Sequence, residues 1–225
     1  MTHHQDTQTI ALVAGATGLV GSHLVEQLLA SSRIGKVIAL TRKPLALQHA
    51  KLENRIVDYN ELEKQVAAFK LSADEAYCAL GTTIKKAGSQ EAFRKVDFDY
   101  ETAFARAAQA AGVTKIALVS SVGANARSGI FYTRVKGETE QAIRALHFPS
   151  LQIFRPGVLL GDRREARPAE QLAVKLTPLI NLTLQGPLKN YRGVHAANVA
   201  KAMVASLGES PSTHIHHYAE IMRAK

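Results

Sequence analysis

Two side chains that could exchange a proton with a bound substrate stand four residues apart in Tyr132-Thr-Arg-Val-Lys136. A tyrosine and a lysine at this spacing share one face of a helix. A free tyrosine, with a pKa near ~10, is a poor proton donor or acceptor at neutral pH. A nearby ammonium group favours the phenolate and brings that pKa toward the working range. The pair, the only Tyr-x-x-x-Lys match in the chain, is therefore a candidate for general acid–base chemistry.

A hydroxyl group that could hold a substrate oxygen precedes this pair. The apolar run Lys115-Ile-Ala-Leu-Val is predicted to be a buried strand, and it ends in Ser120-Ser121. Doubly wound sheets bind their ligands at the carboxyl ends of the strands. A serine at this edge could hold the oxygen while hydride passes between a substrate carbon and a nicotinamide ring.

A glycine-rich turn near the start of the chain could bind the cofactor that such a reaction needs. Ile10 to Ala14 is predicted to be a buried strand, Gly15, Gly18 and Gly21 follow at intervals of three, and Leu19 to Leu29 has helical apolar spacing. A strand, a glycine-rich turn and a helix begin a nucleotide-binding unit, in which the helix N-terminus faces a pyrophosphate. A loop that is merely rich in glycine is the alternative.

The end of the second predicted strand, Gly35 to Thr41, suggests which dinucleotide would bind. An acidic residue there would accept hydrogen bonds from the ribose of NAD, but this chain has Arg42-Lys43. Two cations suit a 2′-phosphate, which arginine can bind in a bidentate manner. The residues therefore favour NADP, with NADPH preferred over NADH, although loop charges in water would look the same.

Strands and helices alternate along the chain, which predicts an α/β fold: a Rossmann-like, doubly wound parallel sheet with helices on both faces. Further strands are expected at Arg55–Asp58, Glu75–Leu80 and Leu151–Arg155, a loop at 85–90, and a long helix over 91–111. Asp58, followed by Tyr59, would lie beside the adenine, and a helix N-cap is an equal alternative for Asp58. The chain is treated as one domain, with a cofactor-binding core over about 9–158 and a lid or substrate region over 159–225.

Composition and charge exclude several classes of protein. No run of 18 apolar residues is present, so no membrane span is expected. The first residues lack the apolar segment of a signal peptide and Cys78 is the only cysteine, so a cytoplasmic location is the default expectation. The net charge of +9 suits a phosphate-bearing ligand better than nucleic acid, because the basic residues are scattered.

Taken together, the glycine turn, Ser121 and the Tyr132/Lys136 pair resemble the short-chain dehydrogenase/reductase superfamily in its atypical branch. Two longer stretches, Cys78 to Gly88 with Val96 to Tyr100, and Phe154 to Arg163, look like the Tat-interactive-protein-like oxidoreductases. The resemblance implies that Ser121, rather than Ser120, joins Tyr132 and Lys136 as the catalytic set. The family's asparagine after the fourth strand is replaced by Asp97, which puts a proton relay through that position in doubt.

The resemblance also implies a set of cofactor-binding residues along the carboxyl edge of the sheet. These are Gly15, Thr17, Gly18, Leu19, Val20 and Gly21 at the pyrophosphate, Arg42 at the 2′-phosphate, Leu80, Gly81 and Thr82 beside the ribose and phosphates, and Pro156, Gly157 and Val158 at the nicotinamide. The implied function is an NADP(H)-dependent oxidoreductase that acts on a small carbonyl or quinone-type substrate. The alternative is an NADP(H)-binding regulatory or protein-interaction module with little or no turnover.

The last third of the chain does not indicate which substrate the protein binds. Asp162 to Arg167 is a charged loop, Gln171 to Leu182 has the apolar spacing of a lid helix, and Val194 to Leu207 is predicted to be a core helix. The terminal His214-Ile-His216-His217 alternates like an edge strand, and no metal is expected there. The expected partner is a small molecule, nucleic acid is not expected, and an oligomer stays open.

Overall fold

A computed structural model describes residues 8–161 and 184–224 of the protein. Seven parallel strands form one sheet in the order β3-β2-β1-β4-β5-β6-β9. Their bounds are β1 Thr9–Ala14, β2 Ile34–Thr41, β3 Leu52–Ile56, β4 Glu75–Cys78, β5 Lys115–Val119, β6 Ser150–Phe154 and β9 Thr213–His216. Two short strands, β7 (Leu159–Leu160) and β8 (Val194–His195), pair beside it. The predicted parallel sheet is confirmed, with β9 as its edge strand.

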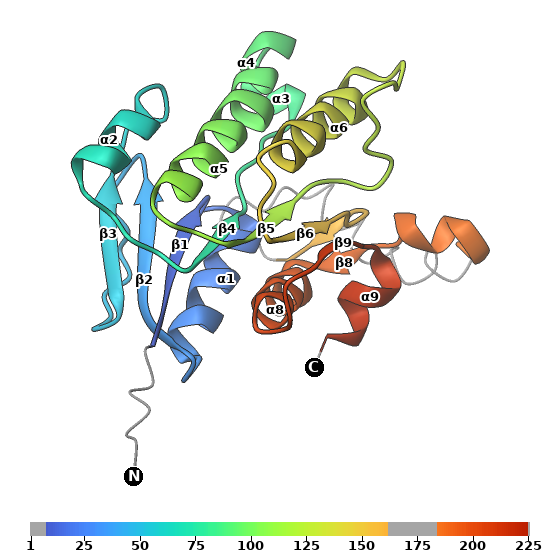
Figure 1. Ribbon diagram of the computed structural model, residues 1–225. Coiled ribbons are helices and arrows are strands. Elements are labelled where there is room, and N and C mark those ends of the chain that lie inside the picture. The colour runs from blue at the N-terminus through green and yellow to red at the C-terminus, as the bar shows by residue number, and fades with distance from the viewer. Residues whose placement is uncertain (1–7, 162–183, 225) are drawn as a thin grey trace.

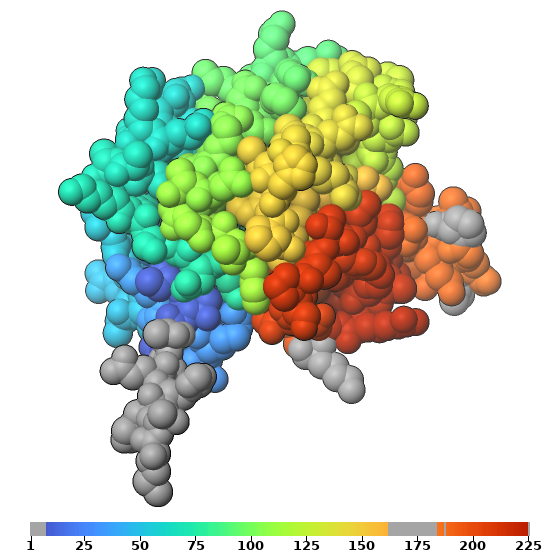
Figure 2. Space-filling view, viewed as in Figure 1, coloured from blue at the N-terminus to red at the C-terminus, as the bar shows by residue number. Residues whose placement is uncertain are grey.

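Helices cover both faces of this sheet (Figure 1). On one face α1 (Leu19–Ala30), α8 (Ala196–Leu207) and α9 (Tyr218–Arg223) pack on residues such as Val13 and Phe154. On the other face α2 (Leu62–Ala68), α5 (Glu101–Ala110) and α6 (Phe131–Arg144) cover Leu12, Leu118 and Ile153. Figure 2 shows α2, α5 and α6 side by side over this second face. The central strands are apolar on both sides because both faces are covered.

The helical region after β4 differs most from the expected pattern. The expected loop over 85–90 contains a short helix, α3 (Ile84–Ala87), and the expected long helix consists of α4 (Gln90–Arg94), the π-helical turn η1 (Lys95–Tyr100) and α5. The hydroxyl of Thr139 on α6 donates to the carbonyl of Asp97 at 2.6 Å. A side chain that donates to a helix carbonyl in this way disturbs the regular backbone hydrogen bonds of the helix. The pattern of apolar residues in the segment does not predict such a contact.

Two predicted strands also have other bounds. β3 lies earlier than expected, so Asp58 and Tyr59 follow it in a turn, and β4 ends at Cys78, two residues before Leu80. A short 3-10 helix, η2 (Gly186–Tyr191), precedes β8. The charged loop 162–167 and the predicted lid helix 171–182 lie outside the described residues.

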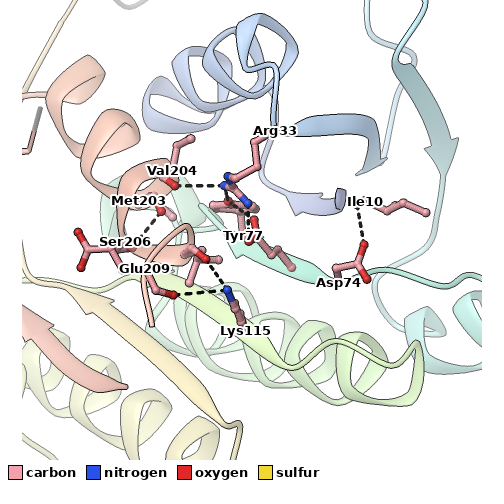
Figure 3. Close-up of polar contacts among 11 residues, drawn as sticks. Ile10, Arg33, Asp74, Tyr77, Lys115, Met203, Val204, Ser206 and Glu209 are labelled. Atoms are coloured by element: carbon pink, nitrogen blue, oxygen red, sulfur yellow. Dashed lines mark hydrogen bonds and ion pairs between the residues drawn. The ribbon is translucent and has the colours of Figure 1, made fainter. Parts of the chain in front are cut away.

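Polar side chains fasten α8 to the amino ends of the strands (Figure 3). Arg33 forms an ion pair with the buried Glu75 at 2.5 Å, and it also donates to the carbonyl of Val204 at 3.3 Å. Tyr77 donates to the second oxygen of Glu75 at 2.8 Å. Lys115 donates to the carbonyl of Leu207, the last residue of α8, at 2.9 Å. These contacts satisfy carbonyls at the helix C-terminus and lie at the edge of the sheet opposite to the predicted site.

Candidate functional site

The glycine-rich turn brings β1, α1 and the end of β4 into backbone contact. Gly15 has a φ of +86°, and a Cβ atom there would lie 2.3 Å from the carbonyl oxygen of Ala79. A Cβ atom on Gly21 would lie 2.0 Å from the carbonyl oxygen of Gly15. Gly18 donates its backbone N–H to the same oxygen at 2.9 Å. Glycine is therefore required at the first and third positions of the motif, where no side chain fits.

The N-terminus of α1 suits an anionic ligand. Gly18 is the N-cap residue and offers no side chain to the helix, and the first turn contains no acidic residue. Thr17 and Gly18 are exposed, Leu19 is half-buried, and Val20 is buried. Because the first N–H groups of a helix lack internal partners and carry the positive end of its dipole, this turn fits a pyrophosphate group.

Arg42 and Lys43 are exposed at the carboxyl end of β2. Among the described residues, neither side chain forms an ion pair. Asn54 on β3 braces their loop: its amide donates to the Thr41 hydroxyl at 2.7 Å and accepts from the Leu45 N–H at 2.8 Å. Asn54 was not predicted, and its only signal is a polar residue within the third strand. Asn54 thus braces the loop that carries the two cations at the carboxyl end of β2.

Asp58 and Tyr59 form the turn beyond β3. Asp58 is exposed and accepts from the backbone and side chain of Asn60, and these bonds lower its pKa. The N-cap of α2 is Glu61, so the alternative role predicted for Asp58 is wrong. Tyr59 is buried, its hydroxyl donates to the Leu40 carbonyl at 2.8 Å, and burial raises its pKa against the opposing charge of Arg42. Tyr59 thus links the turn after β3 to the carboxyl end of β2, next to Arg42.

The turn after β4 carries Leu80, Gly81 and Thr82 between the glycine turn and α6. Gly81 is exposed with a φ of +151°, and the N–H of Thr82 donates to Asp97 Oδ2 at 2.9 Å. A Cβ atom on Gly81 would lie 3.8 Å from Lys136 Nζ. Leu80 is half-buried against the core. The backbone of Gly81 therefore lies between Lys136 and the carboxyl edge of the sheet, where the cofactor is expected.

The two serines at the end of β5 have different surroundings. Ser120 is buried and donates to Glu140 at 2.5 Å, and Glu140 also binds Arg155 through both of its oxygens. Ser121 is half-buried, and among the described residues its hydroxyl contacts only the Val122 carbonyl, at 3.3 Å. The Ser120 hydroxyl is thus part of the structural contact between β5, α6 and β6, whereas that of Ser121 is available to a ligand.

The segment from Ser121 to Tyr132 folds back onto the start of α6. A Cβ atom on Gly137 would lie 2.2 Å from the backbone nitrogen of Ala126, so this loop packs directly on the helix. Gly123 lies beside Thr133, the neighbour of Tyr132, with 3.5 Å between its Cβ position and Thr133 Cγ2. The Tyr132 ring stacks obliquely on Phe93, with 5.4 Å between centroids. No described residue hydrogen-bonds its hydroxyl group.

Lys136 is buried between two carboxylates. Its Nζ lies 2.7 Å from Asp97 Oδ1 and 2.8 Å from Glu101 Oε1. Burial alone would lower the pKa of Lys136, but Glu101 and Asp97 outweigh this effect, Tyr132 adds to them, and the pKa is raised. Lys136 is therefore an ammonium ion at every pH at which the protein would work. Glu101 was not predicted, although a glutamate four residues after Asp97, just ahead of the apolar Phe104 and Ala105, was a visible signal.

The segment after β6 closes the edge of the site. The Pro156 carbonyl accepts from the N–H of Val122 at 2.9 Å, which joins this segment to the loop of Ser121. A Cβ atom on Gly157 would lie 2.5 Å from the carbonyl oxygen of Arg192, and Val158 is exposed. The predicted site residues thus lie along one edge of the sheet, at the carboxyl ends of β1, β2, β4, β5 and β6.

The histidines of β9 have structural partners. His216 lies against Phe154 with 4.4 Å between ring centroids and bonds to Gln152 Oε1 at 2.7 Å. His214 bonds to Glu220 at 2.8 Å. Within the described ranges, no group of three or more histidine, cysteine or acidic residues is arranged to hold a metal ion. No helix within those ranges is long and apolar enough to span a membrane.

Comparisons with known proteins agree with this geometry. The NAD(P)H-binding family matches residues 15–210. Protein HTATIP2 from Rattus norvegicus is 39% identical over 166 residues, covering 72% of this chain and 68% of its own length. Protein FMP52, mitochondrial, from Candida albicans is 38% identical over 157 residues, covering 68% and 69%. Among solved structures, Bordetella bronchiseptica WbmH in complex with NAD+ is similar with a TM-score of 0.69, at 14% identity, covering 93% of this chain and 75% of that one.

These relatives contradict one expectation. Several fungal relatives, 32–38% identical to this chain, are named mitochondrial proteins, so the expected cytoplasmic location is wrong. That expectation rested on the missing apolar segment of a secretory signal, but mitochondrial targeting segments are amphipathic and need no such segment. The family match and the identity to HTATIP2 and FMP52 settle the classification. The chain belongs to the NAD(P)H-binding family and is an atypical short-chain dehydrogenase/reductase that resembles the Tat-interactive protein.

Proposed function

We propose that this protein is an NADP(H)-dependent oxidoreductase that transfers hydride to or from a small carbonyl or quinone-type substrate. One observation carries the proposal: the Lys136 ammonium lies directly beneath Gly81, at the sheet edge that also holds the glycine turn. A dinucleotide that starts at the N-terminus of α1 and follows this edge would bring its nicotinamide end toward Ser121 and Tyr132. NAD-bound structural neighbours support this direction by their fold.

Each residue of the catalytic set has a role that its surroundings support. The half-buried Ser121 hydroxyl would donate a hydrogen bond to the substrate oxygen and fix its position. The Tyr132 hydroxyl would donate a proton to the same oxygen during reduction and accept it during oxidation. The Lys136 ammonium would bind the nicotinamide ribose and stabilise negative charge on the Tyr132 oxygen. NADPH, when bound, supplies the hydride.

Arg42 supports NADP rather than NAD. Its guanidinium group is exposed at the end of β2 and is free of ion pairs among the described residues, and Asn54 braces the loop that carries it. A 2′-phosphate there would gain charge-assisted hydrogen bonds that a 2′-hydroxyl group cannot match. Lys43 adds a second positive charge.

Oxidation of NADPH in the presence of aldehydes and quinones tests the reaction. We expect wild type to turn over with at least one of these acceptors, and Tyr132→Phe to lose about 100-fold or more in kcat, which is the usual contribution of a general acid. The Kd of NADPH should stay within about twofold in this variant. Tyr218→Phe, on α9, is the matched control and should behave like wild type. Equal activity of wild type and Tyr132→Phe would contradict the catalytic assignment.

A second function, a cofactor-binding regulatory or interaction module with little turnover, is favoured by one observation. The Lys136 ammonium already contacts Asp97 and Glu101 inside the protein, which weakens its effect on Tyr132. NADPH binding without oxidation of NADPH by any acceptor, in wild type and variant alike, is the result that this function predicts.

A further inference from the structure

Three ionisable side chains meet in the interior of the protein beside the proposed catalytic set. Lys136, Asp97 and Glu101 have exposed fractions of 4%, 0% and 0%. The ammonium lies 2.7 Å from Asp97 Oδ1 and 2.8 Å from Glu101 Oε1, whereas Asp97 Oδ2 accepts from the N–H of Thr82. Glu101 Oε2 is buried with no hydrogen-bond partner among the described residues. One ammonium therefore serves two carboxyl groups, and one oxygen of Glu101 has no donor.

The neighbours of Glu101 do not balance this count of charges. From α6 it faces Lys136 and Glu140, from η1 it faces Asp97, and from β4 it faces the Cys78 thiol. Glu140 is already paired with Arg155. With both Asp97 and Glu101 ionised, the cluster that these two side chains form with Lys136 would carry a net negative charge, which is costly in a buried site. A single additional proton removes this cost.

The cluster also lies at the surface that the cofactor would contact. The Cβ position of the exposed Gly81 is 3.5 Å from Asp97 Oδ1 and 3.8 Å from Lys136 Nζ. Because Gly81 has no side chain, it covers the Lys136 ammonium with its backbone alone. A shift in the position or charge of the cluster would therefore be felt by a phosphate or ribose group bound at this turn.

We propose that Glu101 is a positioning residue: together with Asp97 it holds the Lys136 ammonium under Gly81, and it carries a proton while it does so. The inference rests on the proposed function, because it assigns Glu101 a role toward the same cofactor. The protonated Glu101 still accepts a hydrogen bond from Lys136 through Oε1, so the ammonium keeps two oxygen partners while the whole cluster stays neutral.

The electrostatics of the group agree with this geometry. Burial raises the pKa of Glu101 to about 8, while Lys136 opposes the shift and Asp97 adds to it. The ordinary value is 4.5, so between pH 4.5 and 8 the folded protein holds a proton that the unfolded chain releases. Stability from this group is fully present below the unfolded value and is lost as the pH rises through the folded one. At neutral pH Glu101→Gln therefore mimics the native, neutral state.

The first test measures thermal unfolding without cofactor from pH 5 to pH 9, for wild type, Glu101→Gln and the control Glu91→Gln, an exposed residue on α4. We expect the melting temperature of Glu101→Gln to rise relative to wild type as the pH increases, with the two proteins closest at pH 5. Glu91→Gln should follow wild type throughout. Parallel profiles of Glu101→Gln and wild type would overturn the assignment of the proton.

The second test measures the Kd of NADPH for the same proteins and for Glu101→Ala. At pH 7 we expect Glu101→Ala to bind about tenfold more weakly, because Lys136 loses one of its two partners, and Glu101→Gln to bind as wild type does. Between pH 7 and pH 9 wild type should lose affinity as Glu101 ionises beside the anionic cofactor, and Glu101→Gln should lose less. Unchanged affinity in Glu101→Ala at all pH values would overturn the positioning role.

The two tests separate this inference from the proposed function. If no protein binds NADPH, the proposed function fails and the positioning role fails with it, whereas the melting profiles still decide whether Glu101 holds a proton. If wild type binds NADPH but Glu101→Gln and Glu101→Ala weaken binding equally at pH 7, cofactor binding is retained and the assignment of a neutral Glu101 is overturned.

Discussion

Gly21 and Gly15 are in direct backbone contact: a Cβ atom on Gly21 would lie 2.0 Å from the carbonyl oxygen of Gly15. The first turn of α1 is thereby held against the end of β1. The N–H groups at the N-terminus of α1 owe their position to this contact. The third glycine of the motif is therefore a packing requirement of the turn, as well as a sequence signature.

Gly21→Ala should consequently impair cofactor binding. The added methyl group pushes α1 away from the turn, and overpacking of this kind costs about 1–3 kcal/mol of stability. We expect the Kd of NADPH to rise about tenfold or more, since tenfold corresponds to about 1.4 kcal/mol. Calorimetric titration with NADPH measures this. Gly129→Ala is the control, because among the described residues no atom outside Gly129 and its two chain neighbours lies within 4 Å of its Cβ position. Comparable affinities of the two variants would argue against the packing explanation.

Arg33→Leu should destabilise the protein without touching the site. Among the described residues, the substitution leaves the side chain of the buried Glu75 with Tyr77 as its remaining donor. Loss of one partner from a largely buried pair, reduced for the partial exposure of Arg33, costs about 2–3 kcal/mol. For a chain of this size the melting temperature should fall by about 5–10 °C.

Lys64→Leu provides the comparison for this prediction. Lys64 pairs with Glu61 at the surface, and its side chain is 83% exposed. Exposed pairs of this kind contribute little to stability. A fall in melting temperature as large in Lys64→Leu as in Arg33→Leu would show that burial of Glu75 is not the cause.

His216 should make the protein sensitive to mild acid. Burial lowers the pKa of His216 to about 4, with His214 adding to the effect, from an ordinary value of 6.5. The neutral ring is the form that stacks on Phe154, so the stability it contributes is present above pH 6.5 and is lost as the pH falls toward 4. In thermal melts, His216→Gln should lose less stability than wild type over this range. The exposed His195→Gln is the control, and a wild-type acid response in His216→Gln would refute the assignment.

Much of the fold followed from local apolar patterns. The buried runs at β1, β2 and β5 predicted central parallel strands, and the helical spacing from Leu19 predicted α1 within one residue. The π-helical turn η1 was not predictable from apolar spacing, and one of its contacts comes from another helix, where the Thr139 hydroxyl donates to the carbonyl of Asp97. Tertiary contacts of this kind leave no periodic signal in the segment that they reshape.

The candidate site, like the fold, was predictable only in part. The types and spacing of Ser121, Tyr132 and Lys136 predicted proton and hydride transfer, and that chemistry stays a proposal. Glu101 was visible as a glutamate four residues after Asp97, but its contact with Lys136 could not be predicted, because it forms only when α5 and α6 pack together. Asn54 was likewise invisible, since its role is to brace a loop from a neighbouring strand.

The affinities of NADPH and NADH for wild type and Arg42→Glu test the central claim most directly, because every proposal for this site requires a bound NADP(H). The account predicts that wild type binds NADPH more tightly than NADH, and that Arg42→Glu loses this preference because a carboxylate repels the 2′-phosphate. Binding of neither nucleotide by wild type would contradict the cofactor site itself, and an unchanged preference in Arg42→Glu would contradict the role of Arg42.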